Sequence, residues 1–213
     1  MKTPNPKVFV VDDDPAILKA VSRLLHSTGL GVTTFGSARE FLDGYDADAH
    51  GCVLLDIEMP GLNGLELQQA LYERGGELPI IFLTGRGDIP KTVQAMKKGA
   101  VDFLTKPADE ADLVRCVRGA IDRDRENRQD RAERADIRRR LDTLTPRERE
   151  VLEQVIAGKL NKQTAADLGT VEKTIKVHRA RIMEKMQVTS LAELVRSMER
   201  VGLRSPPPSS SSS

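Results

Sequence analysis

Five polar residues in the first half of this chain follow or end short apolar runs, and together they could hold a phosphoryl group. They are Asp12, Asp13, Asp56, Thr84 and Lys106. Clustered carboxylates suit a hard cation such as Mg²⁺, which prefers oxygen ligands. An ammonium group and a hydroxyl group suit an anion bound beside that cation. If the five side chains meet, the sequence predicts a site that holds a phosphoryl group on a carboxylate.

The apolar runs explain why these side chains should meet. The runs are VFVV at 8–11, CVLL at 52–55, IIFL at 80–83 and VDFLT at 101–105. Each run is short, and the segments between them have room for helices, which predicts a parallel sheet buried on both faces. Ligands bind such sheets outside the carboxyl ends of the strands, so the polar residues should converge at one edge.

The stretches around these residues resemble the receiver domain of bacterial two-component response regulators. The matching stretches are VVDDD (10–14), LLDIEMPGLNG (54–64), IIFLTGRGD (80–88) and GAVDFLTKP (99–107). They occur in the order and spacing of the family and span nearly all of residues 6–121. The resemblance implies an α/β receiver over 1–121, with a doubly wound, five-stranded parallel sheet in the flavodoxin-like order 2-1-3-4-5.

The resemblance also implies roles for the acidic residues. Asp56 would accept the phosphoryl group and help to bind Mg²⁺. Asp13 resembles a direct Mg²⁺ ligand, Asp12 one that acts at least partly through water, and the backbone carbonyl of Glu58 would supply another oxygen. Glu58 and Arg86 flank the expected path of the hydrolysing water, and one hypothesis is that they pair and slow loss of the phosphoryl group. Two unrelated surface charges are the alternative.

The remaining receiver motifs imply a switch. Lys106 would bind a phosphoryl oxygen, and Thr84 would follow that oxygen with its hydroxyl. Phe103 occupies the position of the family's switch aromatic, and Lys106-Pro107 resembles its cis-proline turn. Ala108 departs from the pattern, because many relatives carry phenylalanine there.

Charge separates the two halves of the chain. Residues 1–121 contain 13 Lys and Arg against 17 Asp and Glu, whereas residues 122–213 contain 20 against 15, within a net charge of +1. An acidic half followed by a basic half favours contact of the second half with a polyanion. Solvation of helix faces accounts for some of the basic excess.

Several classes of protein are excluded by composition. No run approaches the ~20 apolar residues of a membrane span, and the N-terminus lacks the apolar region of a signal peptide. A cytoplasmic bacterial protein without a membrane partner is therefore expected. Cys52 and Cys116 are too few for a disulfide framework, and the three histidines lack the spacing of a zinc site.

Residues 122–142 contain no Gly or Pro and many helix formers of mixed charge. This composition predicts a helical linker, either a solvated spacer or a dimerising helix. The end of the chain, 204–213, reads RSPPPSSSSS and is predicted to be disordered.

Residues 143–203 show the sequence pattern of an all-α domain. Thr145 and Glu148 form a predicted capping box, and Gly169 predicts a tight turn between two helices. Four helices are expected. The first begins after Thr145, and the second begins at Asn161, which acts as its cap. The third spans about 171–185, and the fourth runs from about Ser190 to Arg200. Two short helices joined by a glycine turn, the second with a basic face, are typical of a helix-turn-helix.

Residues 144–195 resemble the LuxR-type DNA-binding domain, so the whole chain resembles the NarL/FixJ class of response regulators, in its FixJ-like branch. The resemblance places the third helix of this domain in the major groove of double-stranded DNA. Lys176 and Val177 would face base edges, with Ala180 at a neighbouring position. Contacts to phosphates are expected from Lys173, Thr174 and Arg181, and further contacts from Asn161 and Lys162.

The expected function is a transcription factor rather than an enzyme. A sensor histidine kinase would phosphorylate Asp56, and phosphorylation would promote a homodimer that binds DNA, with RNA polymerase as a further candidate partner. One alternative is a haloacid-dehalogenase-like phosphatase, although Asp56-Ile57-Glu58 lacks the second aspartate of its motif. The other is a phosphate-independent DNA-binding protein with a degenerate receiver, against which the intact acidic site argues.

Overall fold

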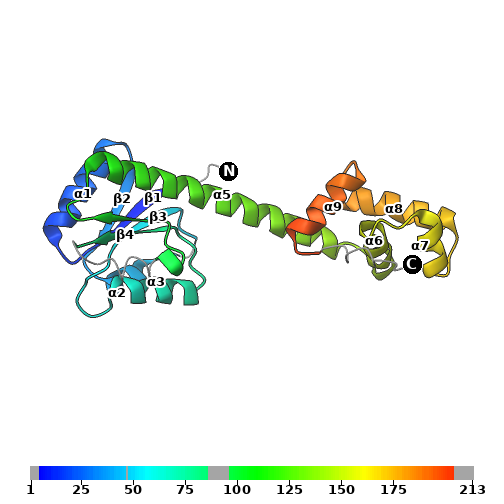
Figure 1. The fold of residues 1–213 in the computed structure, drawn as a ribbon, viewed down its shortest axis with the longest axis horizontal. Helices are drawn as coiled ribbons and strands as arrows, with labels where there is room; N and C mark the ends of the chain where they lie inside the picture. Colours follow the sequence, from blue (N-terminus) through cyan, green and yellow to red (C-terminus); the bar gives the residue numbers. More distant parts are fainter. Residues whose placement is uncertain (1–4, 47, 86–95, 204–213) are drawn as a thin grey trace, which may run out of the picture. The chain divides into compact units, whose positions relative to one another are not determined.

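The computed structural model describes residues 5–46, 48–85 and 96–203 of the chain. Internal contacts divide the chain into two compact units, 1–128 and 129–213. The first contains a sheet with helices, and the second contains helices alone among its described residues (Figure 1). The boundary at 128 falls inside one helix, so the predicted limits at 121 and 142 stay predictions. The predicted tail, 204–213, lies outside the described residues.

Five parallel strands form a single sheet in the order β2-β1-β3-β4-β5, which confirms the predicted fold. The strands are β1 Lys7–Val11, β2 Gly31–Phe35, β3 Gly51–Asp56, β4 Ile80–Thr84 and β5 Asp102–Thr105. Val11 of β1 pairs with Leu55 of β3, and Asp56 pairs with Leu83 of β4. The carboxyl ends of these three strands therefore lie together at one edge of the sheet.

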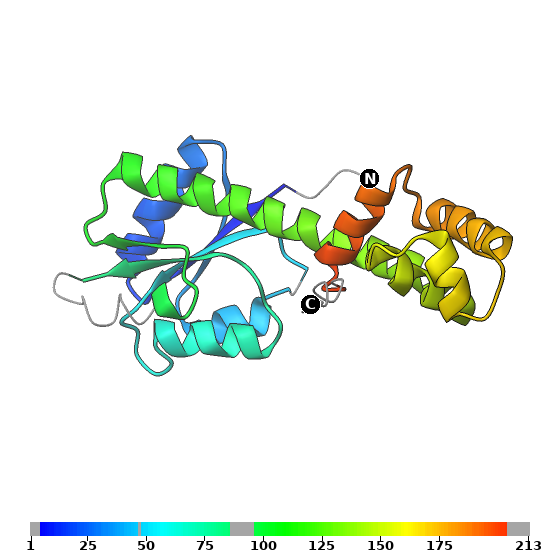
Figure 2. The same cartoon turned by 45° about the vertical axis from the view of Figure 1, so that its right-hand side comes forward.

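Helices cover both faces of the sheet, and successive strand residues point into two different cores. In β1, Phe9 and Val11 lie in the core with α2 and α3, whereas Val8 and Val10 lie in the core with α1 and α5. The two pairs of helices lie on opposite sides of the sheet (Figure 2). These helices are α1 Pro15–Ser27, α2 Ala38–Gly44, α3 Gly64–Glu73 and α5 Glu110–Asp142. Burial on both faces explains why the central strands are continuous apolar runs.

The two edge strands depart from that pattern. β2 reads GVTTF, and Phe35 is its one buried residue. β5 alternates between half-buried and exposed positions, and Phe103 is 42% exposed. The prediction that the run at 101–105 is buried on both faces is therefore wrong, because this strand has a neighbour on one side only and the described residues leave one of its faces open.

Helix α5 continues past the sheet as one helix of 33 residues. Asp124 is 3% exposed, and its carboxylate accepts hydrogen bonds from Gly51 N at 2.9 Å and from Arg128 Nε at 3.0 Å. Arg128 also donates to the carbonyl of Ala49. A buried carboxylate requires such partners. These bonds attach α5 to the start of β3, so the beginning of the predicted solvated linker is built into the first unit.

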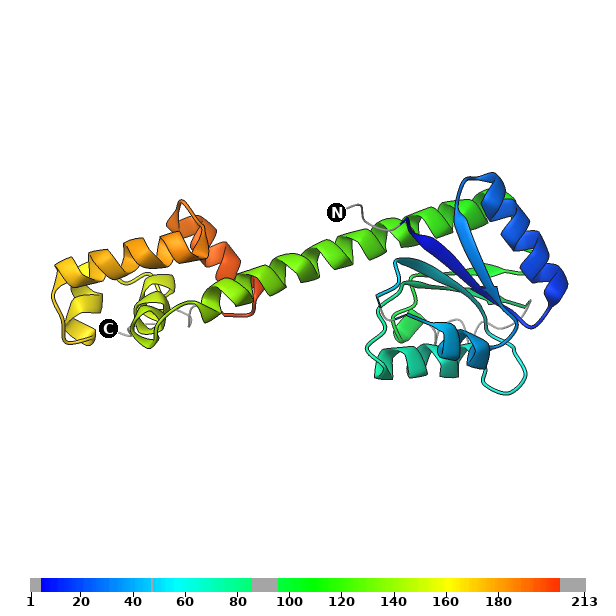
Figure 3. The ribbon, with the colours of Figure 1, turned by 180° about the vertical axis from the view of Figure 1, so that it is seen from behind.

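Among its described residues, the second unit contains four short helices and the last turns of α5. They are drawn in yellow-green to red in Figure 3. The short helices are α6 Pro146–Ile156, α7 Asn161–Asp167, α8 Glu172–Met186 and α9 Leu191–Arg200. Ile175 and Ile182 of α8 are buried with Val151 of α6, Leu194 of α9 and Ile137 of α5. None of the described helices combines the length and apolarity that a membrane span requires.

Local capping explains where these helices begin. The Thr145 hydroxyl accepts from Glu148 N and the Glu148 carboxylate accepts from Thr145 N, which confirms the predicted capping box. The prediction that Asn161 caps α7 is wrong, because Asn161 is its first helical residue and Leu160 precedes it. The Gln163 side chain instead accepts a hydrogen bond from Leu160 N at 2.9 Å.

Candidate phosphoryl site and DNA-binding surface

Three carboxylates meet at the carboxyl edge of the sheet. Asp12 and Asp13 directly follow β1, and Asp56 ends the neighbouring β3. One oxygen from each lies within 4.8 Å of the others. Asp12 and Asp56 are buried, and Asp13 is exposed. Carboxylates this close repel one another, so the cluster requires positive charge and can hold a metal ion.

Lys106 supplies positive charge inside this cluster. Its Nζ lies 2.6 Å from Asp12 Oδ2 and 3.0 Å from Asp56 Oδ2. The backbone N–H of Lys106 donates to the carbonyl of Thr84 at 2.7 Å, which links the loop after β5 to the end of β4. The Lys106-Pro107 peptide bond is cis, as the family resemblance implied. The ammonium group therefore lies where an anion on Asp56 would meet it.

Burial and neighbouring charges shift the pKa values of Asp56 and Lys106 for different reasons. Burial raises the pKa of Asp56 above its ordinary value, Asp12 adds to that rise, and Lys106 opposes it. Burial disfavours the charged form of Lys106, but its bonds to Asp12 and Asp56 outweigh burial and raise the pKa of the ammonium. Lys106 thus remains charged at neutral pH. A second cation at the cluster would further favour the ionised form of Asp56.

The loop after Asp56 approaches the site closely. Glu58 N donates to Asp56 Oδ1 at 3.3 Å. A Cβ at Gly64 would lie 2.2 Å from the carbonyl oxygen of Asp56, so glycine is required there. Asn63 and Glu66 close this loop with a capping box at the start of α3. The hypothesis that Glu58 pairs with Arg86 stays untested, because Arg86 lies outside the described residues.

The two expected switch residues lie on neighbouring strands in different surroundings. Thr84 is 3% exposed, and its hydroxyl donates to the carbonyl of Gly85 at 3.3 Å. Phe103 of β5 pairs in register with Phe82 of β4, and 42% of the residue is exposed. A buried hydroxyl and an exposed ring are therefore two strand positions apart.

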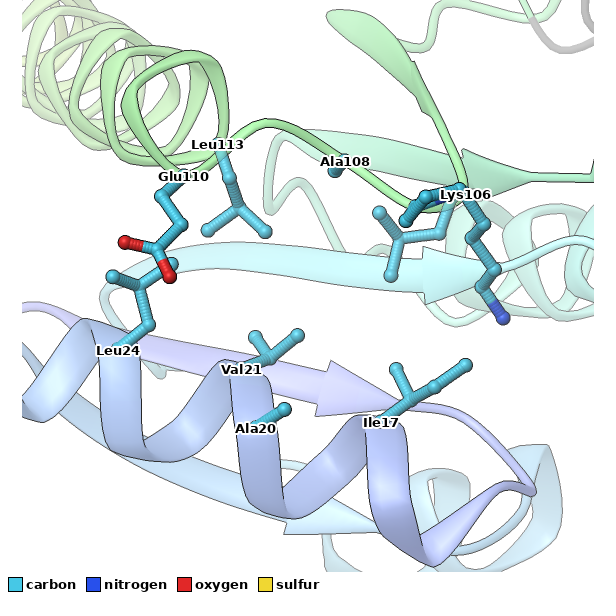
Figure 4. A pocket seen from close by; sticks show the side chains of 10 residues that line it. Ile17, Ala20, Val21, Leu24, Lys106, Ala108, Glu110 and Leu113 are labelled. Carbon is cyan, nitrogen blue, oxygen red and sulfur yellow. The ribbon is translucent and has the colours of Figure 1, made fainter.

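An apolar groove of about 480 Å³ opens beside the site, between α1 and the start of α5 (Figure 4). Ile17, Val21 and Leu24 line it from α1, with Leu113 from α5 opposite. Lys106, Pro107 and Ala108 are also in its wall. The small side chain of Ala108 leaves room in this groove.

The described cysteines are packing residues. Cys52 is buried in the core beneath α1 and α5, and burial raises the pKa of its thiol to about 12. The thiol of Cys116 donates to Asp102 Oδ2 at 3.1 Å, and partial burial together with that bond raises its pKa to about 11. Both thiols remain protonated and poorly nucleophilic at neutral pH.

Helices α7 and α8 form a helix-turn-helix. Gly169 takes a φ of 62° in the turn between them, a conformation that suits glycine. The predicted contact residues on α8 share one face, where all except the half-buried Thr174 are exposed: Lys173, Lys176, Val177, Ala180 and Arg181. Lys162 of α7 is exposed, and Asn161 is half-buried. The helix therefore presents a basic surface with an apolar centre.

Two side-chain pairs on this surface were not anticipated from the sequence. Lys176 Nζ lies 3.2 Å from Glu172 Oε1, one turn earlier on α8. Arg179 donates to Asn161 Oδ1 at 3.0 Å, which joins α8 to α7. The first pair has an i,i+4 spacing that could have revealed it. The second pair joins residues on different helices, so no local sequence pattern predicts the contact.

A buried ion pair fixes the other end of α8. The Glu148 carboxylate is 2.7 Å from Lys185 Nζ, and Lys185 also donates to the carbonyl of Thr143 at 3.0 Å. Glu148 is 2% exposed. The Lys185 bond is the main cause that lowers the pKa of Glu148, with the Thr145 bonds adding to it against burial.

We therefore predict that Glu148→Gln destabilises the second unit by about 2 kcal/mol at pH 7, the scale of a hydrogen bond to a charged partner. Because folding lowers the pKa of Glu148, its contribution is complete above its ordinary value of 4.5 and is lost as pH falls through the folded value. Urea unfolding of the full chain, followed by NMR signals of α6 and α8, should show the stabilities of the two proteins converging as the pH falls below 4.5 and through the folded value.

The matched control is Glu150→Gln, which removes a surface partner of Arg147. This change should leave stability within about 0.5 kcal/mol. Equal effects of the two substitutions at pH 7 would contradict a special role for Glu148.

An acidic, lysine-containing edge on a doubly wound sheet, joined in one chain to a helix-turn-helix, defines a regulator of transcription that responds to a phosphoryl group. Residues 8–118 match the response regulator receiver domain, and residues 142–198 match the bacterial regulatory proteins of the luxR family. The chain belongs to the two-component response regulators that join a receiver domain to a LuxR-type DNA-binding domain. This membership sets aside the phosphatase alternative.

Individual relatives cover nearly the whole chain. Nodulation protein W of Bradyrhizobium diazoefficiens is 45% identical over 92% of this chain and 86% of that protein. The transcriptional regulatory protein FixJ of Azorhizobium caulinodans is 44% identical over 89% of this chain and 90% of that protein. The solved structure of the response regulator StyR, 44% identical, covers 92% of this chain and 99% of that chain with a TM-score of 0.80.

Proposed function

We propose that a sensor histidine kinase in the bacterial cytoplasm transfers a phosphoryl group to Asp56, and that this transfer controls DNA binding by the second unit. The observation that carries the proposal is the contact of Lys106 with both Asp12 and Asp56 at the carboxyl edge of the sheet. A nucleophilic carboxylate, a fixed ammonium and two further acids match the needs of phosphoryl transfer, which depends on positioning and on neutralising charge.

The acidic cluster fits Mg²⁺ by the chemistry of its donors. Asp12, Asp13, Asp56 and the backbone carbonyl of Glu58 would hold the ion through oxygen, the ligand atom that Mg²⁺ prefers. When bound, Mg²⁺ neutralises the negative charge of the phosphoryl oxygens. The mutual approach of the three carboxylates within 4.8 Å supports this assignment.

Each residue of the site has a separate role in the proposed phosphoryl transfer. An Asp56 oxygen forms a bond to phosphorus as the bond from phosphorus to the kinase's histidine nitrogen breaks. Lys106 binds one of the phosphoryl oxygens, and Thr84 turns its hydroxyl from the Gly85 carbonyl towards another. Phe103, exposed in this state, would follow Thr84 inward and reshape the surface around β5 and α5.

That surface change would favour a homodimer, which presents two recognition helices to paired DNA half-sites. RNA polymerase is a further candidate partner of the DNA-bound form. The direct test is a footprint across genomic DNA with and without acetyl phosphate. Sites protected equally in both samples would favour the phosphate-independent alternative.

On α8 we assign base contacts to Lys176 and Val177, with Ala180 beside them. Lysine reads guanine O6 and N7, and valine contacts the thymine methyl group. Phosphate contacts are assigned to Lys173, Thr174 and Arg181, with further contacts from Asn161 and Lys162. The exposure of the α8 residues on one face supports the assignment.

Two lysines on this face should therefore behave differently. Lys176→Ala should cost roughly 1–3 kcal/mol of binding and relax the base preference at one position. Lys173→Ala should weaken all sequences alike and reduce the slope of log affinity against log salt by about one. Binding to randomised sites at two salt concentrations separates the two effects. Uniform, salt-dependent losses in both variants would identify Lys176 as a phosphate contact.

A further inference from the structure

Glu172 occupies an unexpected place for an acid in a DNA-binding surface. It is the first residue of α8, and its Oε1 lies 3.2 Å from Lys176 Nζ. Both side chains are well exposed, Glu172 at 47% and Lys176 at 64%. They share the exposed face of α8 with Val177 and Ala180. The charged groups are therefore presented to a ligand together.

Helix stability and phosphate binding account for only a small part of this pairing. An acid in the first turn is favoured by the helix macrodipole, but that effect does not require contact with Lys176. An exposed ion pair at this spacing contributes little to stability. Close to DNA, a carboxylate is repelled by phosphates unless it accepts a hydrogen bond from a base. In the major groove, such donors are the amino groups of cytosine and adenine.

The geometry of the pair matches one base pair in particular. Guanine O6 and cytosine N4 are hydrogen-bonded to each other in a G·C pair, roughly 2.9 Å apart, and both face the major groove. The two charged groups of the protein are 3.2 Å apart. An A·T pair also presents a neighbouring donor and acceptor, but thymine offers a lysine only O4 beside a methyl group. Guanine offers O6 and N7.

We propose that Glu172 is a specificity-determining residue. Its carboxylate accepts a hydrogen bond from a cytosine amino group, while Lys176 donates to the guanine of the same pair. Glu172 also repels sites that present only acceptors at that position, so it contributes by rejection as well as by attraction. The inference rests on the proposed role of α8 as the recognition helix, whose N-terminal residues face base edges.

The test compares the full-length, phosphorylated chain with Glu172→Ala, Glu172→Gln and a control, Glu184→Ala. Glu184 is exposed towards the other end of α8. Binding is measured over randomised sites, and then on a selected site in which the cytosine carries an N4-methyl group that blocks its free amino hydrogen. The wild type should prefer G·C at one position and lose roughly tenfold in affinity on the methylated site, the scale of one good base contact.

Glu172→Ala should lose the sensitivity to methylation and keep only the weaker G·C preference that Lys176 provides alone, while it binds other sequences more tightly because a negative charge is gone. Glu172→Gln should shift the preference towards adenine, which glutamine reads through N6 and N7. Glu184→Ala should keep the wild-type preference. Unchanged base preference in both Glu172 variants would overturn the proposal. A wild type without any base preference would instead overturn the role of α8 itself, and this inference with it.

Discussion

Replacement of Asp56 by asparagine is expected to abolish the phosphoryl adduct of this chain. The amide nitrogen and oxygen of asparagine keep the size of the carboxylate but lack its negative charge and nucleophilicity. Asp56 ends β3 with its Oδ2 3.0 Å from Lys106 Nζ and with 5% of the residue exposed. Asp12 also contacts Lys106, at 2.6 Å, but none of that residue is exposed. The measurement is the intact mass after incubation with acetyl phosphate and Mg²⁺.

The adjacent acids provide matched controls. Asp14 is the cap of α1, where its side chain accepts from Ala16 N. Asparagine also caps helices well, so Asp14→Asn should keep the full adduct. Asp13→Asn, which removes an expected metal ligand, should slow phosphorylation and raise the Mg²⁺ concentration it requires. A full adduct on Asp56→Asn would show that another residue accepts the phosphoryl group.

The first unit could largely be predicted because its central strands are buried on both faces. Burial makes β3 and β4 continuous apolar runs, and the polar residues that end them stand out. The edge strand β2 carries no such signal: the consecutive Thr33 and Thr34 interrupt its apolar residues, at a half-buried and an exposed position. Its existence followed only from the family resemblance. The exposure of Phe103 was missed for the same reason, since an apolar sequence does not reveal that a strand lies at an edge.

Long-range polar contacts were beyond prediction. Asp124 looked like one more charge on a solvated helix, yet it is buried against the backbone of Gly51, 73 residues away in sequence. The pairing of Asn161 with Arg179 likewise depends on how α7 packs on α8. By contrast, the capping box of Thr145 and Glu148 was predictable, because both partners lie within one turn. The partner of Glu148 on α8, Lys185, was not.

Phosphorylation is expected to convert the chain from monomer to dimer and to tighten binding to paired half-sites by about a hundredfold, the lower end of the gain from linking two binding modules. Each chain presents one recognition helix among its described residues, and a single module of this kind buries a small interface on DNA. A dimer makes the second binding event intramolecular, because the first recognition helix holds the second near its half-site.

The spacing of the two DNA half-sites provides a specific test of this dimer. Half-sites read by a two-fold dimer must lie one helical turn apart or a multiple of it, about 10 base pairs. Sedimentation of the chain with acetyl phosphate should show the dimer, and affinity should be measured on sites with the natural spacing and with about 5 base pairs inserted. Insertion turns one half-site to the opposite side of the duplex, so the phosphorylated protein should lose its advantage there, while Asp56→Asn should bind both sites equally weakly.

A phosphorylated chain that stays monomeric with unchanged affinity would mean that the signal from Asp56 reaches DNA by another route. A dimer that tolerates the insertion would show instead that its two DNA-binding units are flexibly joined, and that the gain comes from tethering rather than from a fixed arrangement of the two recognition helices.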